Sequence, residues 1–236
     1  MGAFKTYSLD GKTYEAYVAY PNRGTAPYPA VLVFHAWAGR DAFSCKKADQ
    51  LAELGYVGIA LDLYGEGQVG RNNSENQRLM EPLIQNRLEL RRRALSGLEF
   101  AKTLPQINSD KIAAIGFCFG GLCALDLARS GAQLSGVVSF HGLLMPAQGF
   151  KNELIHSKIL ALHGHDDPMV KPQDVLEFEK EMTHCQADWQ VHVYGQTMHA
   201  FTNDQANDPS FGTVYHPLAD QRAWKALRNF LEEVFS

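Results

Sequence analysis

A cysteine flanked by glycines, in the segment Gly116-Phe117-Cys118-Phe119-Gly120-Gly121, separates two stretches of different character. The apolar run Ile112–Ile115 before it is typical of a buried strand, whereas residues 122–128 have a helical pattern. A strand that turns sharply into a helix strains the residue at the turn, and bulky flanking side chains would clash there. The turn would place Cys118 at a helix N-terminus, where the partial positive charge favours a thiolate. The segment therefore predicts a strand, a tight turn with a reactive cysteine, and a helix.

Strand and helix patterns alternate along the rest of the chain. Strands are expected at residues 30–34, 56–61, 111–115, 136–140, 158–163 and 189–194, after an N-terminal hairpin that turns at Asp10-Gly11. Helices are expected at residues 41–54, 74–104, 172–182 and 217–234, the second broken near Pro82 and capped by Ser74 with Gln77. Such alternation implies right-handed crossovers and a mostly parallel sheet with helices on both faces. The length predicts one α/β domain over residues 1–236.

Composition and charge indicate which binding partners and which cellular location to expect. The net charge is −4, and the triplet Arg91–Arg93 falls in a helical pattern, so we expect no nucleic-acid partner. No apolar run approaches membrane-spanning length and no secretory signal begins the chain, so we expect no membrane partner and a cytoplasmic protein with reduced thiols. The four cysteines show no zinc-type spacing, and we expect neither a metal nor another cofactor.

Reactive side chains follow several of the expected strands. Cys118 follows the strand at 111–115, an Asp pair follows the strand at 158–163, and His199 follows the strand at 189–194. Active sites of open parallel sheets gather at the carboxyl ends of strands, so we expect these groups to meet. His199 would take the thiol proton and later protonate the leaving group, while a carboxylate orients the imidazole. The sequence therefore predicts a nucleophile, acid and base in that chain order.

The acid has two candidates, Asp166 and Asp167. Asp167 precedes Pro168, which restricts its backbone to extended conformations, and we expect it to orient His199. Asp166 is expected to face solvent. The oxyanion that forms during attack needs backbone N–H donors, which we assign to Phe119 and Trp37.

Four motifs together carry a family resemblance: GFCFGG at 116–121, ALDLYG at 60–65, HGHDDPMV at 163–170 and YGQTMHAF at 194–201. With them the chain resembles the dienelactone hydrolase family, a cysteine branch of the α/β-hydrolases, over nearly its whole length. The resemblance implies an α/β-hydrolase fold with about eight strands and no large lid. It also implies a metal-free Cys118–His199–Asp167 triad and hydrolysis of enol lactones or related esters.

The chain departs from the family pattern at two places. The family typically has a glutamate where this chain has Ala36, so activation of Cys118 would fall mainly to His199. Lactone-specific members hold the substrate carboxylate with arginines, and Asn203 stands where one of them is expected; Arg78 is a candidate for the other. Because a carboxylate clamp depends on the arginine fork, its partial loss at Asn203 predicts weak recognition of dienelactone itself.

The pocket and the substrate follow as expectations. We expect the substrate to be contacted by residues from several loops: His35, Ala36, Tyr64, Arg78, Phe201 and Asn203. A substrate pocket of this kind favours neutral activated aryl esters and lactones. A thiolate could also displace an aryloxide from a phosphotriester. The alternatives are a carboxymethylenebutenolidase acting on a carboxylated lactone, and a non-catalytic or redox-sensing binding module. A homodimer and a monomer both stay open.

Overall fold

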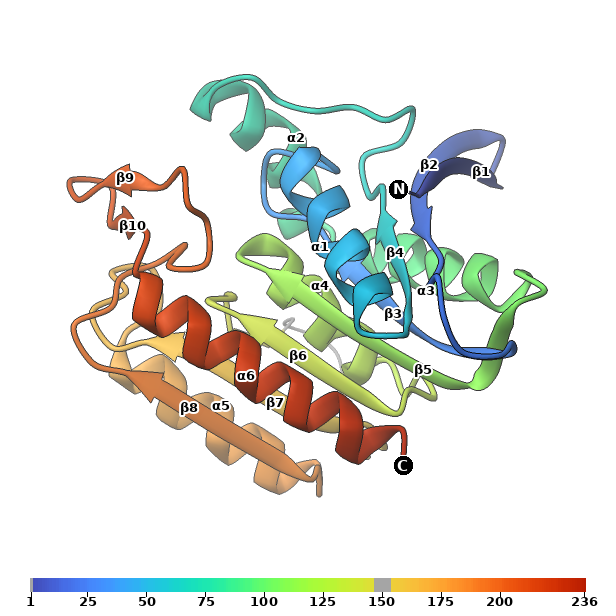
Figure 1. Cartoon of the computed structure of the whole chain (residues 1–236). Coiled ribbons are helices and arrows are strands. Elements are labelled where there is room, and N and C mark those ends of the chain that lie inside the picture. Colours follow the sequence, from blue (N-terminus) through green and yellow to red (C-terminus); the bar gives the residue numbers. More distant parts are fainter. Residues whose placement is uncertain (1, 147–153) are drawn as a thin grey trace. The chain divides into compact units, whose positions relative to one another are not determined.

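The computed structural model describes residues 2–146 and 154–236 (Figure 1). The chain divides into two compact units, residues 1–115 and 116–236, which are described separately. One domain over residues 1–236, as the length indicates, stays a prediction.

The first unit is built on five strands: β1 (Ala3–Leu9), β2 (Lys12–Ala19), β3 (Tyr28–Phe34), β4 (Val57–Leu61) and β5 (Ile107–Phe117), in the order β1-β2-β4-β3-β5. The predicted hairpin is present: β1 and β2 pair antiparallel across Asp10 and Gly11, which both have positive φ, as a type I′ turn requires. Strands β3 and β4 are parallel. β4 is buried throughout, which explains its continuous apolar sequence.

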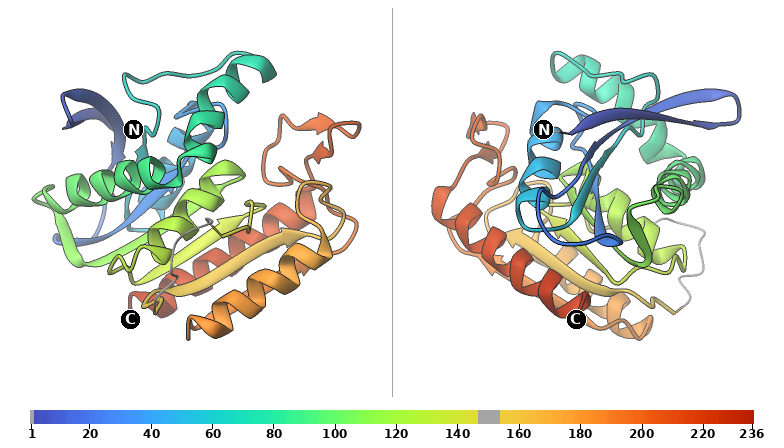
Figure 2. Two further views of the ribbon diagram at one scale, coloured as in Figure 1. Left: turned by 180° about the vertical axis from the view of Figure 1, so that it is seen from behind. Right: turned by 45° about the vertical axis from the view of Figure 1, so that its right-hand side comes forward.

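Three helices accompany these strands: α1 (Ala42–Glu53), α2 (Asn73–Gln85) and α3 (Arg87–Lys102). Figures 1 and 2 show α1 and α3 on opposite faces of the first unit's strands. The expected cap at Ser74 is wrong, because Asn72 accepts from the Glu75 amide (3.0 Å) and α2 begins one residue earlier. The break lies at Asn86, past Pro82, since the Asn86 side chain caps α3 by accepting from the Glu89 amide (3.1 Å).

The elbow strand is longer than expected. β5 begins at Ile107 and not at Lys111, and its first part, Asn108–Asp110, is polar and exposed or half-buried. A search for buried apolar runs misses such a strand end because the pattern that identifies it begins only at Ile112.

The second unit contains α4 (Phe119–Arg129), β6 (Gly136–Phe140), β7 (Lys158–Gly164), α5 (Pro172–His184), β8 (Trp189–Tyr194), the short pair β9 (Asn207–Asp208) and β10 (Thr213–Val214), and α6 (Pro217–Val234). Strands β6, β7 and β8 are neighbours and parallel. Figures 1 and 2 show α6 on one face of these strands and α4 and α5 on the other. Apart from the β9–β10 pair, the strands of both units make up an eight-stranded, mostly parallel sheet with helices, which confirms the predicted fold class.

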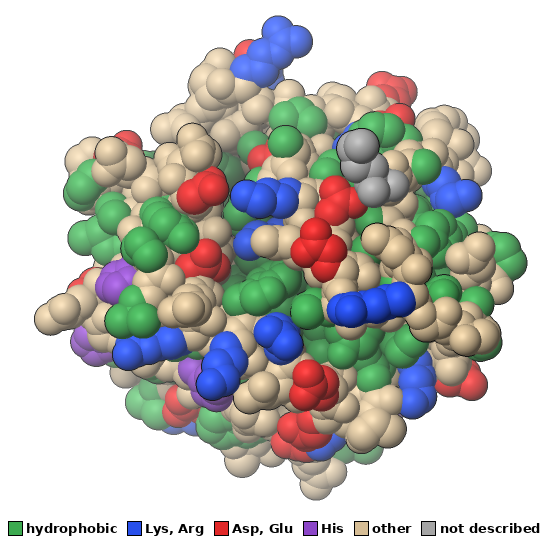
Figure 3. All heavy atoms as spheres, viewed as in Figure 1, with side chains coloured by type: hydrophobic (Ala, Val, Ile, Leu, Met, Phe, Trp, Pro, Cys, Tyr) green, Lys and Arg blue, Asp and Glu red, His purple; other side chains and the backbone are tan. Residues whose placement is uncertain are grey.

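Two further features are the charge of the visible surface and the length and apolar character of the helices. On the face drawn in Figure 3, basic and acidic side chains are interspersed. Within residues 2–146 and 154–236, no helix combines the length and the apolar character needed to cross a membrane.

Candidate active site

Cys118 occupies the turn between β5 and α4. Its backbone is at φ 55° and ψ −118°, a strained conformation for a residue with a side chain. It is the N-cap of α4, so the partial positive charge of the helix end acts on its side chain. Its amide donates to the Phe140 carbonyl at the end of β6 (3.0 Å), which ties the turn to the neighbouring strand. The side chain remains half-exposed.

The glycines beside Cys118 permit close approach. A Cβ on Gly116 would collide with the backbone carbonyl of Gly120. A Cβ on Gly121 would lie 2.7 Å from the Cα of Gly142, closer than real Cβ atoms come. Any side chain at either position would push α4 away from the strand ends, so the turn that presents Cys118 depends on both glycines.

Asp167 and His199 form a buried pair. The Nδ1 atom of His199 donates to Oδ2 of Asp167 at 2.7 Å, and both side chains are at most 1% exposed. The other carboxylate oxygen accepts from the Met169 amide (2.8 Å), so both oxygens are held. Asp166 is exposed, as expected. The structure therefore brings Asp167, and not Asp166, to the histidine.

Electrostatics keep His199 protonated. Burial acts to lower its pKa, but the charge of Cys118 and the hydrogen bond and charge of Asp167 outweigh burial and raise the pKa to about 10. Among the described residues, none forms a well-aligned hydrogen bond with Nε2, the nitrogen opposite the Asp167 contact. Cys118 thus acts on His199 without ideal geometry, as pairs in enzymes without substrate often do. The arrangement places an imidazolium on His199 beside the Cys118 side chain.

A loop segment fixes the backbone of His199. Its amide donates to the Gly212 carbonyl and its carbonyl accepts from the Val214 amide, both at 3.0 Å. Gly212 has φ +80°, and a Cβ there would collide with the ring of Pro168, the residue after Asp167. The segment that carries β9 and β10 therefore contacts His199 and the residue that follows Asp167.

In the first unit, His35 and Tyr64 shape the loop that carries Ala36 and Trp37. Burial lowers the pKa of His35, whose Nδ1 donates to the Ala36 carbonyl (2.6 Å) while Nε2 accepts from the Leu63 amide (3.2 Å). The Tyr64 hydroxyl donates to the Trp37 carbonyl (2.8 Å). These contacts use both His35 nitrogens and fix a neutral tautomer, so His35 holds the loop in place.

The other predicted pocket residues lie in different surroundings. Phe201 is fully buried and stands edge-on to Tyr194, with ring centroids 5.5 Å apart. Asn203 is half-buried, and its side chain accepts from the Gln205 amide (3.1 Å). Arg78 is exposed on α2. With Arg71 it lines a hollow of about 720 Å³ in the first unit.

Two buried histidines beside the pair carry no role in the sequence analysis. His141 follows β6 and stands edge-on to His199, with ring centroids 5.1 Å apart. Burial lowers the pKa of His163, at the end of β7, and the charge of Asp167 opposes that effect. Their positions at strand ends are the signal that identified His199, but sequence alone does not say which ring faces which.

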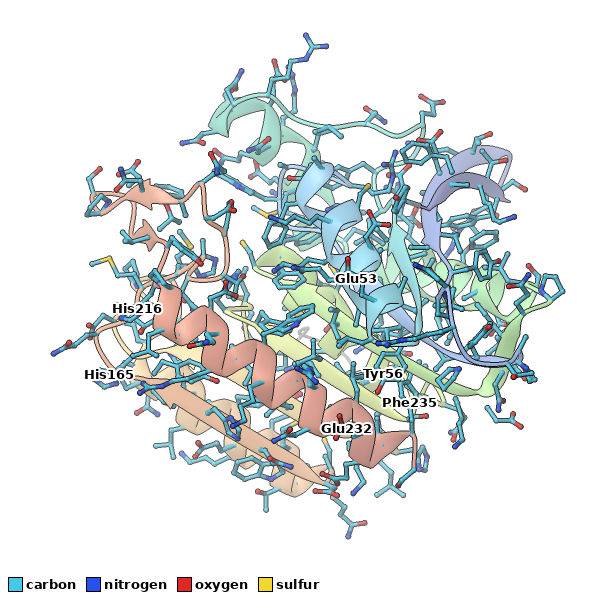
Figure 4. The ribbon with its side chains drawn as sticks, viewed as in Figure 1. Glu53, Tyr56, His165, His216, Glu232 and Phe235 are labelled. Carbon is cyan, nitrogen blue, oxygen red and sulfur yellow. The ribbon has the colours of Figure 1, made fainter. Side chains whose placement is uncertain are left out.

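Within the part of the chain that the structure describes, no cluster of three His, Cys, Asp or Glu side chains has a geometry that could hold a metal ion. His165, which follows β7, is exposed. Figure 4 marks it together with His216, whose ring accepts from the Ala219 amide (3.3 Å) at the start of α6.

Comparisons with known proteins identify relatives of this chain. An uncharacterized Caenorhabditis elegans protein is 36% identical over 63% of this chain and 96% of its own length. An Aquifex aeolicus protein named "Putative carboxymethylenebutenolidase" is 30% identical over 98% of each chain. The crystal structure of a dienelactone hydrolase-like promiscuous phosphotriesterase from metagenomic libraries superposes with a TM-score of 0.95 at 32% identity, covering 100% of this chain and 99% of its own.

The family assignment rests on most of the chain. Residues 14–235 match the sequence profile of the dienelactone hydrolase family. This match and the structural similarity confirm the predicted α/β-hydrolase fold. They also confirm an enzyme that hydrolyses ester or lactone bonds, against the alternative of a non-catalytic binding module. The chain belongs to the dienelactone hydrolase family.

Proposed function

We propose that this enzyme hydrolyses activated neutral esters and lactones through a covalent intermediate on Cys118. The observation that carries the proposal is the buried 2.7 Å contact between Asp167 and His199 together with the effect of Cys118 on the same ring. A nucleophile beside a base that is oriented by a carboxylate is the arrangement required for nucleophilic catalysis.

In the first half-reaction, the Cys118 thiolate attacks the substrate carbonyl carbon. A sulfur–carbon bond forms, and the carbonyl electron pair moves to oxygen. When the tetrahedral intermediate collapses, the bond to the leaving oxygen breaks and the His199 imidazolium gives that oxygen its proton. The products are a thioester on Cys118, a neutral imidazole and a free alcohol or phenol; for a lactone, the alcohol stays attached to the acyl chain.

In the second half-reaction, water replaces the leaving group. Neutral His199 takes a proton from water as the water oxygen bonds to the thioester carbon. Collapse of the intermediate expels the Cys118 thiolate and releases the acid, and His199 is again an imidazolium. Asp167 stays ionised and keeps Nε2 directed toward the reaction.

Backbone donors would stabilise the oxyanion of both intermediates. Phe119 is the first residue of α4, a position whose amide has no acceptor within the helix. Losing one oxyanion donor typically costs about 3 kcal/mol of transition-state stabilisation. Trp37 stays the predicted second donor.

Substrate preference follows from the departure at Asn203. Its side chain lacks the positive charge that would bind a substrate carboxylate, so an uncharged ester is favoured over dienelactone. The related enzyme from metagenomic libraries is described as a promiscuous phosphotriesterase. We extend that activity to this chain, with the Cys118 thiolate attacking phosphorus and an aryloxide leaving.

A second candidate is a carboxymethylenebutenolidase acting on a carboxylated lactone. Arg71 and Arg78 line the hollow of the first unit, and guanidinium groups bind carboxylates well. The name of the Aquifex aeolicus relative points the same way.

A substrate panel tests both candidates. Purified wild type and Cys118→Ser would be assayed with dienelactone, a neutral aryl ester, a neutral lactone and an aryl phosphotriester. We expect a higher kcat/KM for the neutral aryl ester than for dienelactone, measurable phosphotriester turnover, and a large loss of each activity in Cys118→Ser. Dienelactone turnover far above that of the neutral substrates would favour the second candidate, and full activity of a Cys118→Ala variant, which has no nucleophilic side chain at this position, would exclude Cys118 as the nucleophile.

A further inference from the structure

The carboxyl end of β6 touches both the proposed nucleophile and the proposed base. The Phe140 carbonyl accepts from the Cys118 amide at 3.0 Å. The next residue, His141, places its ring 5.1 Å from that of His199, with the planes at 64° in an edge-to-face arrangement. One dipeptide thus connects the turn that presents the thiol to the ring that must exchange protons with it.

His141 is itself firmly held. It is 2% exposed, and its Nε2 lies 2.9 Å from Oγ1 of Thr202. Its amide donates to the Leu162 carbonyl on β7 (2.8 Å). Its ring also stands edge-on to Phe201, with centroids 5.1 Å apart and planes at 77°. Because these contacts hold the His141 ring in place, it can restrict the movement of the His199 ring.

The backbone of His141 is strained. Its φ is 38°, in the left-handed region that residues with side chains rarely adopt. Glycine would relieve this strain but would remove the ring from His199. Such strain at a site of this kind points to a role for the side chain beyond filling space.

We propose that His141 is a positioning residue for His199, a role that rests on the triad proposed above. The hydrogen bond with Asp167 fixes only one end of the His199 ring, which can still tilt about that contact. The flat ring of His141 against it limits the tilt and keeps Nε2 directed at Cys118 and the leaving group. Displacements of about 1 Å at such a site can lower the rate about 100-fold.

The test compares His141 variants of different shape. His141→Phe keeps a flat ring, whereas His141→Leu and His141→Ala do not. Tyr194→Ala is the matched control, because it also removes a ring, half-buried in this case, that stands edge-on to Phe201. For each folded variant, kcat and KM for a neutral aryl ester are measured, together with the pH profile of Cys118 alkylation by iodoacetamide.

We expect His141→Leu and His141→Ala to lower kcat by about 10- to 100-fold with little change in KM. In both, the alkylation profile should shift because Cys118 loses part of its contact with the imidazolium. His141→Phe and Tyr194→Ala should keep kcat within about threefold of wild type and leave the profile unchanged. If His141→Ala does not fold, the comparison of kcat between His141→Phe and His141→Leu tests the positioning role.

Two results would overturn the inference: equal kcat in His141→Phe and His141→Leu, or an equal loss in Tyr194→Ala. Cys118→Ala and His199→Ala, assayed in parallel, separate this failure from failure of the proposed function. If these two variants are inactive while the His141 variants are not impaired, only the positioning role fails. If Cys118→Ala or His199→Ala keeps full activity, the triad itself is wrong.

Discussion

His199 is protonated because its partners outweigh its burial. Burial alone would favour a neutral ring, as it does at His35 and His163. The difference at His199 is that a carboxylate lies on one side and a thiol that can become a thiolate on the other. The raised pKa therefore keeps a proton on His199 that the ring could give to a leaving group.

Asp167→Asn tests this balance. The raised pKa means that His199 holds its proton below pH about 10 and loses it as the pH rises through that value. Removing the carboxylate removes one of the causes of the raised pKa, so the alkaline loss of activity should move to lower pH. Since Asn also disfavours the required tautomer, kcat should fall on the order of 10³- to 10⁴-fold.

The measurement is the pH dependence of kcat for an ester with a poor leaving group, which needs the acid. Asp166→Asn is the control, because Asp166 is the exposed neighbour. Asp166→Asn should leave unchanged both kcat and the pH at which activity is lost on the alkaline side. An Asp167→Asn enzyme with a wild-type pH profile would contradict the role of the carboxylate.

Each residue of the proposed triad carries a local signal in the sequence, which is why the sequence predicts it. Pro168 separated Asp167 from Asp166, and glycines marked Cys118. His141 was missed even though it also follows a buried strand. Its positive φ and its orientation toward His199 arise from tertiary packing, which no short sequence pattern records.

At the scale of elements, the segment from β9 to β10 braces the histidine. Gly212 and Val214 bond both backbone polar groups of His199. Gly212 also packs against Pro168, so this segment contacts both His199 and the residue next to Asp167.

Gly212→Ala should therefore impair catalysis. The added Cβ would press on Pro168 and shift Asp167 relative to His199, lowering kcat by about 10- to 100-fold. Gly131→Ala is a matched control, because Gly131 has a similar φ of +78° but open space around the new Cβ. Both variants should lose about 1 kcal/mol of stability from backbone strain. Equal kcat in the two variants, measured with one ester under the same conditions, would show that the brace has no catalytic role.

The regular elements were predicted well where their pattern is periodic or continuous. The strand at Trp189–Tyr194 and the helix at Pro217–Val234 have the expected bounds. The errors lie at ends that depend on one side chain, such as the Asn72 cap, or on polar residues in a strand, such as Asn108. Several residues near Asn72 can cap a helix, so the pattern does not select one.

At the scale of the whole molecule, the proposed triad lies in one part of the chain, whereas the proposed substrate contacts come from both. Cys118, Asp167 and His199 all belong to residues 116–236, as does Asn203, whereas Ala36 and Arg78 belong to residues 1–115. The motifs that identify the family are mostly those of the reaction chemistry. For this reason the sequence predicted the class of reaction more sharply than the substrate.

The covalent intermediate on Cys118 is the central claim, and intact-protein mass spectrometry tests it most directly. Wild type and His199→Ala would be mixed with a neutral aryl ester, quenched in acid and weighed, and the peptide Ile112–Arg129 would then be sequenced. We predict one acyl group on Cys118, accumulating most in His199→Ala because that variant lacks the base for deacylation. An enzyme that turns over the ester while neither protein ever carries an acyl group on that peptide would contradict the account.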